Sequence, residues 1–171
     1  RQVQTVLYLC LDVLTRLWAP ILCHTTEEVN DFMHFDDESI HLSSFASVDL
    51  DVDANRLVEQ MGKLLAVRKD VLKALEIARA DGLIKKSLEA SIRLFVSDEI
   101  RALFEEIVPN PAQWLIVSGV EFVEEPLTAF DVCGVEVEKA KGHVCPRCWN
   151  YTESEHEDGL CDRCAQILNL E

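Results

Sequence analysis

The sequence lacks the marks of a membrane or secreted protein. Its longest apolar runs are far shorter than the ~18 apolar residues of a membrane-spanning helix, so no membrane span is expected. It opens without the basic start, apolar block and small-residue cleavage site of a signal peptide. It also has no initial Met, and apolar residues recur at helical spacing from Val3 onward. We therefore expect a piece of a longer protein that begins inside a helix.

Basic residues are scarce relative to acidic ones. The 171 residues include 16 Lys and Arg against 31 Asp and Glu, a net charge of −15, which opposes nonspecific binding to nucleic acid. The imbalance is uneven, because residues 56–101 carry 10 basic and 7 acidic groups while the flanking segments are strongly acidic. A nucleic-acid partner is therefore expected to meet this middle segment or the basic residues between 139 and 147.

Four of the seven cysteines form two C-x2-C pairs, with the overall pattern C-x2-C-x12-C-x2-C. This pattern is typical of a four-cysteine zinc ribbon. Two residues between cysteines allow a tight turn that directs both sulfurs at one metal, and Pro146 favours the first turn. Because every ligand position is cysteine, one structural Zn²⁺ is expected with no position for a catalytic water. The predicted ligands are Cys145, Cys148, Cys161 and Cys164.

Other uses of these cysteines stay open. Two disulfides, free thiols or bound iron fit the same spacing, and His143 or His156 could replace one cysteine. Cys10, Cys23 and Cys133 remain as an odd number on separate segments, which favours a reducing cytoplasm over a secreted disulfide scaffold. The zinc site in a cytoplasmic protein is the preferred interpretation.

Helical periodicity dominates the first part of the chain. Apolar spacing predicts a helix over residues 3–18, which Pro20 ends and which is expected to be buried in a bundle. A capping box at residues 25–28 predicts a second helix through Met33.

The longest predicted helix covers residues 54–81. It follows an acidic, irregular connection over residues 34–53 and ends at Gly82. Arg68 takes a position in its apolar stripe, where the side chain either extends along the edge of the core to solvent or contacts a phosphate.

The pattern changes near residue 90, where alternation of apolar and polar residues begins. Ser97 is expected to cap a short helix that ends before Pro109, and a last helix is expected at 165–168. The predicted strands are 91–96, 113–117 and 132–138, and residues 120–124 either continue the second of these past Gly119 or form a strand of their own. The expected fold is a mainly α-helical bundle over 1–82, a small α+β unit over 83–138 and a four-cysteine zinc ribbon over 139–171.

Three stretches resemble bacterial isoleucyl-tRNA synthetases. The specific one is KGHVCPRCWNY at 141–151 with CDRC at 161–164, which is similar to the C-terminal end of that family. APIL at 19–22 with TEEV at 26–29 resembles its anticodon-binding helices. Arg79 with SLEA at 87–90 resembles the segment that leaves the long helix. The order of the stretches matches, so the resemblance covers essentially the whole chain.

The resemblance implies a parent enzyme that joins isoleucine to its tRNA with ATP. The motifs H-I-G-H and K-M-S-K-S and the editing region are absent from this sequence, so no catalytic residues are expected in it. Its implied role is to hold the anticodon stem-loop of isoleucine tRNA so that the tRNA end reaches a distant active site. The implied partners are this tRNA and the rest of the synthetase, without DNA or membrane, in a monomer.

Aromatic and basic side chains are the expected RNA contacts. Beside the zinc site the candidates are Trp149, Arg147 and Lys141, and Trp149 fits a packing role over the metal equally well. On the long helix the candidates for phosphate contacts are Arg68, Lys69, Lys73 and Arg79.

Two other functions remain open. Some DNA glycosylases end in a similar zinc finger, but they need an N-terminal proline nucleophile on a separate β domain, whereas Pro20 is internal and the chain is acidic. A zinc-ribbon module for protein interaction is the second alternative.

Overall fold

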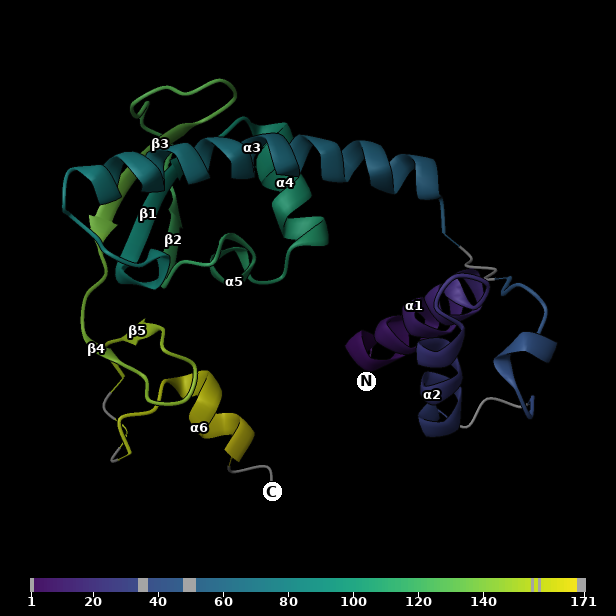
Figure 1. Cartoon of the computed structure of the whole chain (residues 1–171). Helices are drawn as coiled ribbons and strands as arrows, with labels where there is room; N and C mark the ends of the chain where they lie inside the picture. Colours follow the sequence, from purple (N-terminus) through teal and green to yellow (C-terminus); the bar gives the residue numbers. More distant parts are fainter. Residues whose placement is uncertain (1, 34–36, 48–51, 155, 157, 169–171) are drawn as a thin grey trace. The chain divides into compact units, whose positions relative to one another are not determined.

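The computed structural model describes residues 2–33, 37–47, 52–154, 156 and 158–168 (Figure 1). The chain divides into two compact units, Arg1–Val52 and Asp53–Glu171. Among the described helices, none combines the length and the apolar character needed to cross a membrane.

The first unit contains the helices α1 (Gln2–Trp18) and α2 (Cys23–Met33) and the short 3-10 helix η1 (Ile40–Leu42). The helix predicted over 3–18 is confirmed, and it ends before Pro20. The predicted capping box is wrong, because α2 begins earlier, at Cys23. Thr25, the predicted capping residue, therefore lies inside the helix and not at its N-terminal end.

The predicted burial of α1 is not observed. Val3 is 72% exposed, and most other apolar side chains of α1 are also exposed. Thr15 is buried, and its hydroxyl donates to the Leu11 carbonyl oxygen at 2.7 Å. The apolar pattern therefore identified the helix correctly but not its surroundings in this chain. The predicted acidic connection lies partly outside the described residues, namely at 34–36 and 48–51.

The second unit begins with the long helix α3 (Ala54–Ala80), which confirms the prediction to within one residue at its C-terminal end. The Asp53 side chain caps it by accepting a hydrogen bond from the Arg56 N–H at 3.0 Å. Gly82 follows at a φ of 74°, a conformation that suits glycine at a helix end. These local signals determine where α3 begins and ends.

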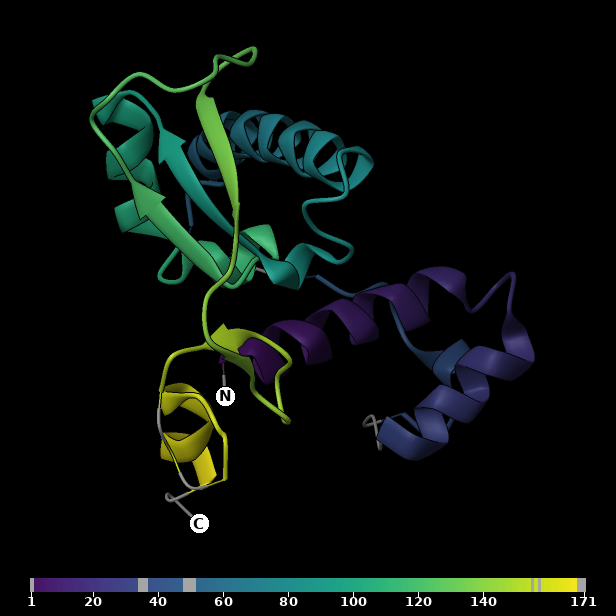
Figure 2. The same cartoon turned by 90° about the vertical axis from the view of Figure 1, so that its left-hand side faces the viewer.

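A three-stranded sheet lies against α3, with strand order β2-β1-β3 (Figure 2). The central strand is β1 (Ala90–Phe95), with β2 (Gly119–Phe122) parallel and β3 (Gly134–Lys139) antiparallel to it. Side chains on one face of β1 are buried in alternation, as the sequence predicted. They share a core with α3 and α4 (Asp98–Ile107), which the Ser97 hydroxyl caps.

One predicted strand is wrong. Residues Pro111–Leu115 form the short helix α5 where a strand over 113–117 was expected. The Asn110 side chain accepts a hydrogen bond from the Gln113 N–H at 3.0 Å, and Pro111 stands at the first helical positions, where its fixed φ is favourable. Ile116 then reverses the chain at a φ of 60°.

The segment predicted to be the zinc ribbon contains a hairpin and a short helix among its described residues. The hairpin of β4 (His143–Val144) and β5 (Tyr151–Thr152) is followed by α6 (Asp162–Leu168), which begins three residues before the predicted helix. The 3-10 helix η2 (Ser87–Glu89) precedes β1. The fold class is thus a helical N-terminal region, a small mixed sheet and a four-cysteine cluster.

Candidate metal centre and nucleic-acid interface

The structure brings four sulfur atoms together, those of Cys145, Cys148, Cys161 and Cys164, all within 4.8 Å of one another. Zinc–sulfur bonds of about 2.3 Å in a tetrahedron place sulfurs about 3.8 Å apart. The Cys148 and Cys161 sulfurs are 3.6 Å apart, which suits one zinc ion and is too long for a disulfide. The donor set therefore fits a structural zinc.

Neither candidate histidine joins this cluster. The His143 Nε2 atom lies 3.0 Å from the Gly159 carbonyl oxygen. The His156 Nε2 atom lies 2.9 Å from the Asp162 carboxylate. Both rings thus have hydrogen-bond partners around the cluster, while four sulfurs make up its centre.

Backbone hydrogen bonds shape the turn around the first cysteine pair. The Cys145 N–H donates to the Asn150 carbonyl oxygen at 2.9 Å, and the Trp149 N–H donates to the Cys145 carbonyl oxygen at 2.9 Å. Gly142 approaches the opposite strand so closely that a Cβ atom there would lie 2.0 Å from the Thr152 carbonyl oxygen. Only glycine fits at this position, which also has a φ of 85°.

Hydrogen bonds favour the thiolate at Cys145, whereas burial and the hydrogen bonds with the neighbouring cysteine sulfurs raise the pKa of Cys161 to about 11. Burial opposes ionisation of Cys145, but backbone N–H groups of Cys148, Cys161 and Arg147 lower its pKa to about 6. Burial also acts against the charge on Arg163, but its hydrogen bonds to the Cys148 and Cys164 sulfurs raise its pKa. The Arg163 guanidinium thereby offsets part of the negative charge of a four-thiolate site.

Trp149, a candidate both for RNA contact and for packing over the metal, is largely exposed. It is 68% exposed, and its φ is 63°. It lines a hollow of about 440 Å³ between the ribbon and η2. The other lining residues are Lys86, Leu88, Glu89, Val144 and Tyr151. The remaining ribbon candidates are Lys141 and Arg147, which lie close to Trp149 in the sequence. Both are exposed, and neither forms an ion pair with a described residue.

The candidates on α3 differ in their availability. Lys73 Nζ lies 2.6 Å from the Asp131 carboxylate, and this hydrogen bond raises the lysine pKa. Arg79 pairs with Glu76 and donates to the Ser87 hydroxyl at 3.1 Å. These two cations already have acidic partners on the protein.

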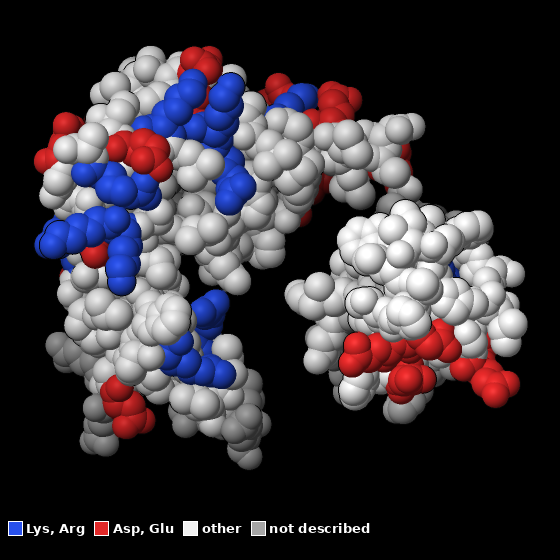
Figure 3. Space-filling model, viewed as in Figure 1, with Lys and Arg blue, Asp and Glu red and all other residues white. Residues whose placement is uncertain are grey.

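Arg68 and Lys69 are the freer pair on α3. The Arg68 guanidinium carbon lies 5.7 Å from the centre of the Trp114 ring, and its Nε atom is buried without a hydrogen-bond partner. Lys69 is exposed and has no ion pair with a described residue. Figure 3 shows that Lys and Arg side chains gather over α3 and its C-terminal end, and again on the ribbon. The helix and ribbon candidates thus form separate clusters.

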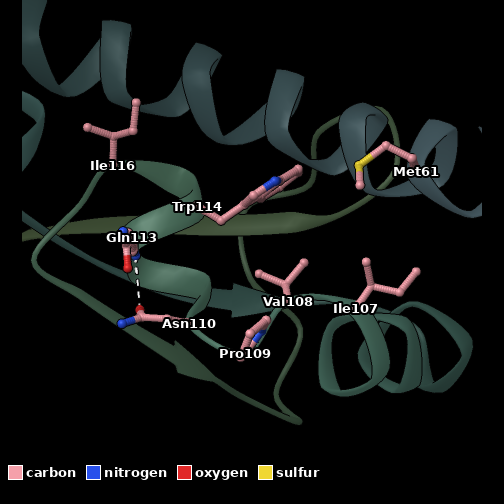
Figure 4. Close-up of a pocket in the computed structure, with 8 residues that line it drawn as sticks. All are labelled: Met61, Ile107, Val108, Pro109, Asn110, Gln113, Trp114 and Ile116. Atoms are coloured by element: carbon pink, nitrogen blue, oxygen red, sulfur yellow. Dashed lines mark hydrogen bonds between the residues drawn. The ribbon is translucent and has the colours of Figure 1, made fainter. Parts of the chain in front are cut away.

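A second hollow lies beneath α3 and has a volume of about 480 Å³ (Figure 4). Its lining is mostly apolar and contains no titratable side chain, so it offers neither an acid, a base nor a metal ligand. The lining residues are Met61, Ile107, Val108, Pro109, Asn110, Gln113, Trp114 and Ile116.

Sequence reasoning missed three residues around the Trp149 hollow. Tyr151 lies in the quoted motif and Lys86 in a pair of lysines, so both had a local signal. Ser118 had none, although its hydroxyl contacts Tyr151. A contact between residues 33 positions apart depends on the pairing of strands and not on any local pattern.

Comparison with known proteins agrees with this geometry. Residues 1–94 match the family described as the anticodon-binding domain of tRNA ligase, and residues 142–167 match the zinc finger found in FPG and IleRS. The first match disfavours the DNA-glycosylase alternative, which rested on the zinc finger alone.

Curated relatives match almost the whole chain. An isoleucine–tRNA ligase of Persephonella marina is 40% identical over 181 residues, which include 98% of this chain and 19% of the relative. Isoleucine–tRNA ligases of Lactobacillus acidophilus and Bacillus cereus are 36% and 40% identical, and each alignment again includes 98% of this chain and 19% of the relative. The chain therefore spans about a fifth of the length of these relatives.

Proposed function

Because the chain belongs to the family of anticodon-binding domains of tRNA ligases, we propose that it binds the anticodon stem-loop of isoleucine tRNA. In this proposal the parent enzyme joins isoleucine to that tRNA with ATP, and its catalytic residues lie outside this chain. The contribution of the chain is to orient the tRNA, which raises the rate by positioning the reacting groups.

The observation that carries this proposal is the solvent exposure of Trp149 together with its positive φ. Its indole is exposed, and a positive φ is a genuine outlier for so bulky a residue. Such a backbone costs about 1–3 kcal/mol and tends to persist at functional sites. Stacking of a base on an aromatic ring contributes about 1–3 kcal/mol, which is enough to compensate for that cost.

The hollow beside Trp149 has the chemistry of a site for an unstacked base. Leu88, Val144 and Tyr151 supply apolar and aromatic walls. The Glu89 carboxylate accepts a hydrogen bond from the Lys85 N–H at 2.8 Å, which lowers its pKa and keeps it charged. A charged carboxylate can accept a hydrogen bond from a base amino group, while Lys86 lies close enough to meet a phosphate.

Cations around the two clusters supply the attraction to the RNA backbone. We propose phosphate contacts for Lys141 and Arg147 on the ribbon and for Arg68 and Lys69 on α3. Lys73 and Arg79 are proposed as weaker contacts, because each must first give up an acidic partner. The zinc ion holds the ribbon that presents Trp149 and takes no part in chemistry.

The test replaces Trp149 by Ala in the zinc-loaded chain. Affinity for the anticodon stem-loop of isoleucine tRNA is measured by fluorescence anisotropy, and a loss of about ten-fold or more is expected from the missing stack. Trp149→Phe, which keeps a smaller ring, is expected to lose less.

Val132→Ala is the control, because Val132 is also an exposed large apolar residue but lies outside residues 1–94 and outside the ribbon. It is expected to leave the affinity unchanged. Equal binding of this stem-loop and an unrelated one, with the same salt dependence, would contradict the proposed recognition. An unchanged affinity in Trp149→Ala would contradict the role of the indole.

A further inference from the structure

The orientation of the zinc ribbon within its unit depends on a small number of polar contacts. The chain reaches the ribbon through Ala140, whose N–H donates to the Glu89 carbonyl oxygen at 2.7 Å. Among the described residues, two side-chain hydrogen bonds join 142–168 to 53–138, and they involve Ser118 and Arg163.

Ser118 makes the better of these two contacts. Its hydroxyl oxygen accepts a hydrogen bond from the Tyr151 N–H at 2.8 Å and donates its own proton to the Leu88 carbonyl oxygen at 2.6 Å. The Arg163 contact to Gln113 is 3.5 Å long and exposed, at the limit for a hydrogen bond. Of the side-chain hydrogen bonds that join the ribbon to its neighbour, the one to the Ser118 hydroxyl is therefore the stronger.

Ser118 is itself held firmly. Its N–H donates to the Ala90 carbonyl oxygen at 2.9 Å, at the start of β1, and β2 begins at the next residue. Gly119 packs so closely on β1 that an added Cβ would lie 2.6 Å from the Ser91 hydroxyl oxygen. The hydroxyl of Ser118 is thus fixed relative to the sheet.

The two hydrogen-bond partners of the Ser118 hydroxyl belong to residues that line one hollow from two different elements. Leu88 belongs to η2 and Tyr151 belongs to the ribbon, and both line the hollow beside Trp149. Tyr151 also pairs with Val144 across the β4–β5 hairpin, so two of the residues on the ribbon side of the hollow belong to one paired hairpin. The distance between the walls is therefore set at Ser118.

We propose that Ser118 is a positioning residue, whose hydroxyl fixes the orientation of the zinc ribbon to the sheet and sets the opening of the hollow beside Trp149. The consequence for RNA binding rests on the proposed function, whereas the orientation itself does not.

The experiment compares Ser118→Ala with the wild-type chain, both loaded with zinc. Residual dipolar couplings of backbone amides are measured for residues 53–138 and 142–168. One alignment tensor is expected to fit both segments in the wild type, and two different tensors in Ser118→Ala. One equivalent of zinc in both proteins shows that the ribbon is folded, so a change in stability alone does not produce this result.

Two further comparisons isolate the hydroxyl group. Ser118→Thr keeps a hydroxyl group, whereas Ser118→Val has a methyl group of similar size in its place. A single tensor is therefore expected for Ser118→Thr and two for Ser118→Val. Ser154→Ala is the control, because the Ser154 hydroxyl bonds to Thr152 inside the ribbon, at 2.8 Å. It is expected to keep a single tensor.

Affinity for the isoleucine tRNA stem-loop is measured on the same proteins, and Ser118→Ala is expected to bind about three- to ten-fold more weakly. A single tensor in both Ser118→Ala and Ser118→Val overturns the positioning role. Two tensors with unchanged affinity overturn the link between the opening and RNA binding. A wild-type chain that does not bind the stem-loop contradicts the proposed function. In that case the alignment tensors alone test whether Ser118 fixes the orientation of the ribbon.

Discussion

At the scale of single residues, Asp70 shows how one buried charge joins distant segments. It is 1% exposed, and its carboxylate accepts a hydrogen bond from the Val132 N–H at 2.7 Å. Lys73 Nζ lies 3.6 Å away, and the Cys133 sulfur 3.8 Å away. Burial, together with the neighbouring Asp70 charge, raises the pKa of the Cys133 thiol to about 12, so it stays protonated. Asp70 thus anchors the loop before β3 to α3.

Asp70→Ala is expected to lower the free energy of unfolding of the second unit by about 2–3 kcal/mol, because the Val132 N–H loses its partner. Amide hydrogen exchange of α3 measures this change. Glu59→Ala is the control, since Glu59 lies exposed on the same helix, and its effect is expected to stay within about 0.5 kcal/mol. Equal exchange in the two variants would contradict the anchoring role.

At the scale of elements, local capping signals decided which predictions succeeded. The α3 helix was predicted almost to its ends because Asp53 and Gly82 mark them. The apolar run from Trp114 to Val117 fits a strand or a helix equally well by pattern, and the Asn110 cap with Pro111 makes it helical. The burial of α1 could not be predicted, since an apolar stripe does not identify what covers it.

The ribbon is the element expected to depend most on a bound zinc ion. Its buried core consists of Leu160, Ala165 and two of the cysteines, which is too small to fold without further support. Structural zinc contributes roughly 10–16 kcal/mol of apparent binding free energy in small domains.

Removal of zinc by a chelator is therefore expected to unfold residues 142–168 and to leave α3 and the sheet folded. Amide resonances of the two regions report this directly. Cys161→Ser is expected to give the same pattern, with less than one equivalent of zinc by elemental analysis. A variant that retains a full equivalent would remove Cys161 from the ligand set.

At the scale of the whole molecule, the distribution of charge matters more than its sum. The sequence indicated a basic middle segment in an acidic chain, and the structure shows which of its cations are paired. That pairing involves residues far apart in the sequence, such as Lys73 and Asp131, so composition could not reveal it. The hollow between η2 and the ribbon was unpredictable for the same reason.

The salt dependence of RNA binding tests this distribution. The four main phosphate contacts proposed, those of Lys141, Arg147, Arg68 and Lys69, contribute a slope of about −3 for log affinity against log salt concentration with a single-stranded loop. Lys69→Ala is expected to reduce the magnitude of the slope by about 0.7. Lys63→Ala is the matched control, because Lys63 already pairs with Glu59 and Glu99, and it is expected to leave the slope unchanged.

Trp149 has a left-handed backbone, so at this position the requirements of folding conflict with those of the proposed RNA recognition. Glycine there would relieve about 1 kcal/mol of strain and remove the indole. Selection for heat resistance alone should therefore discard the aromatic ring, and only selection on the proposed recognition of RNA should preserve it.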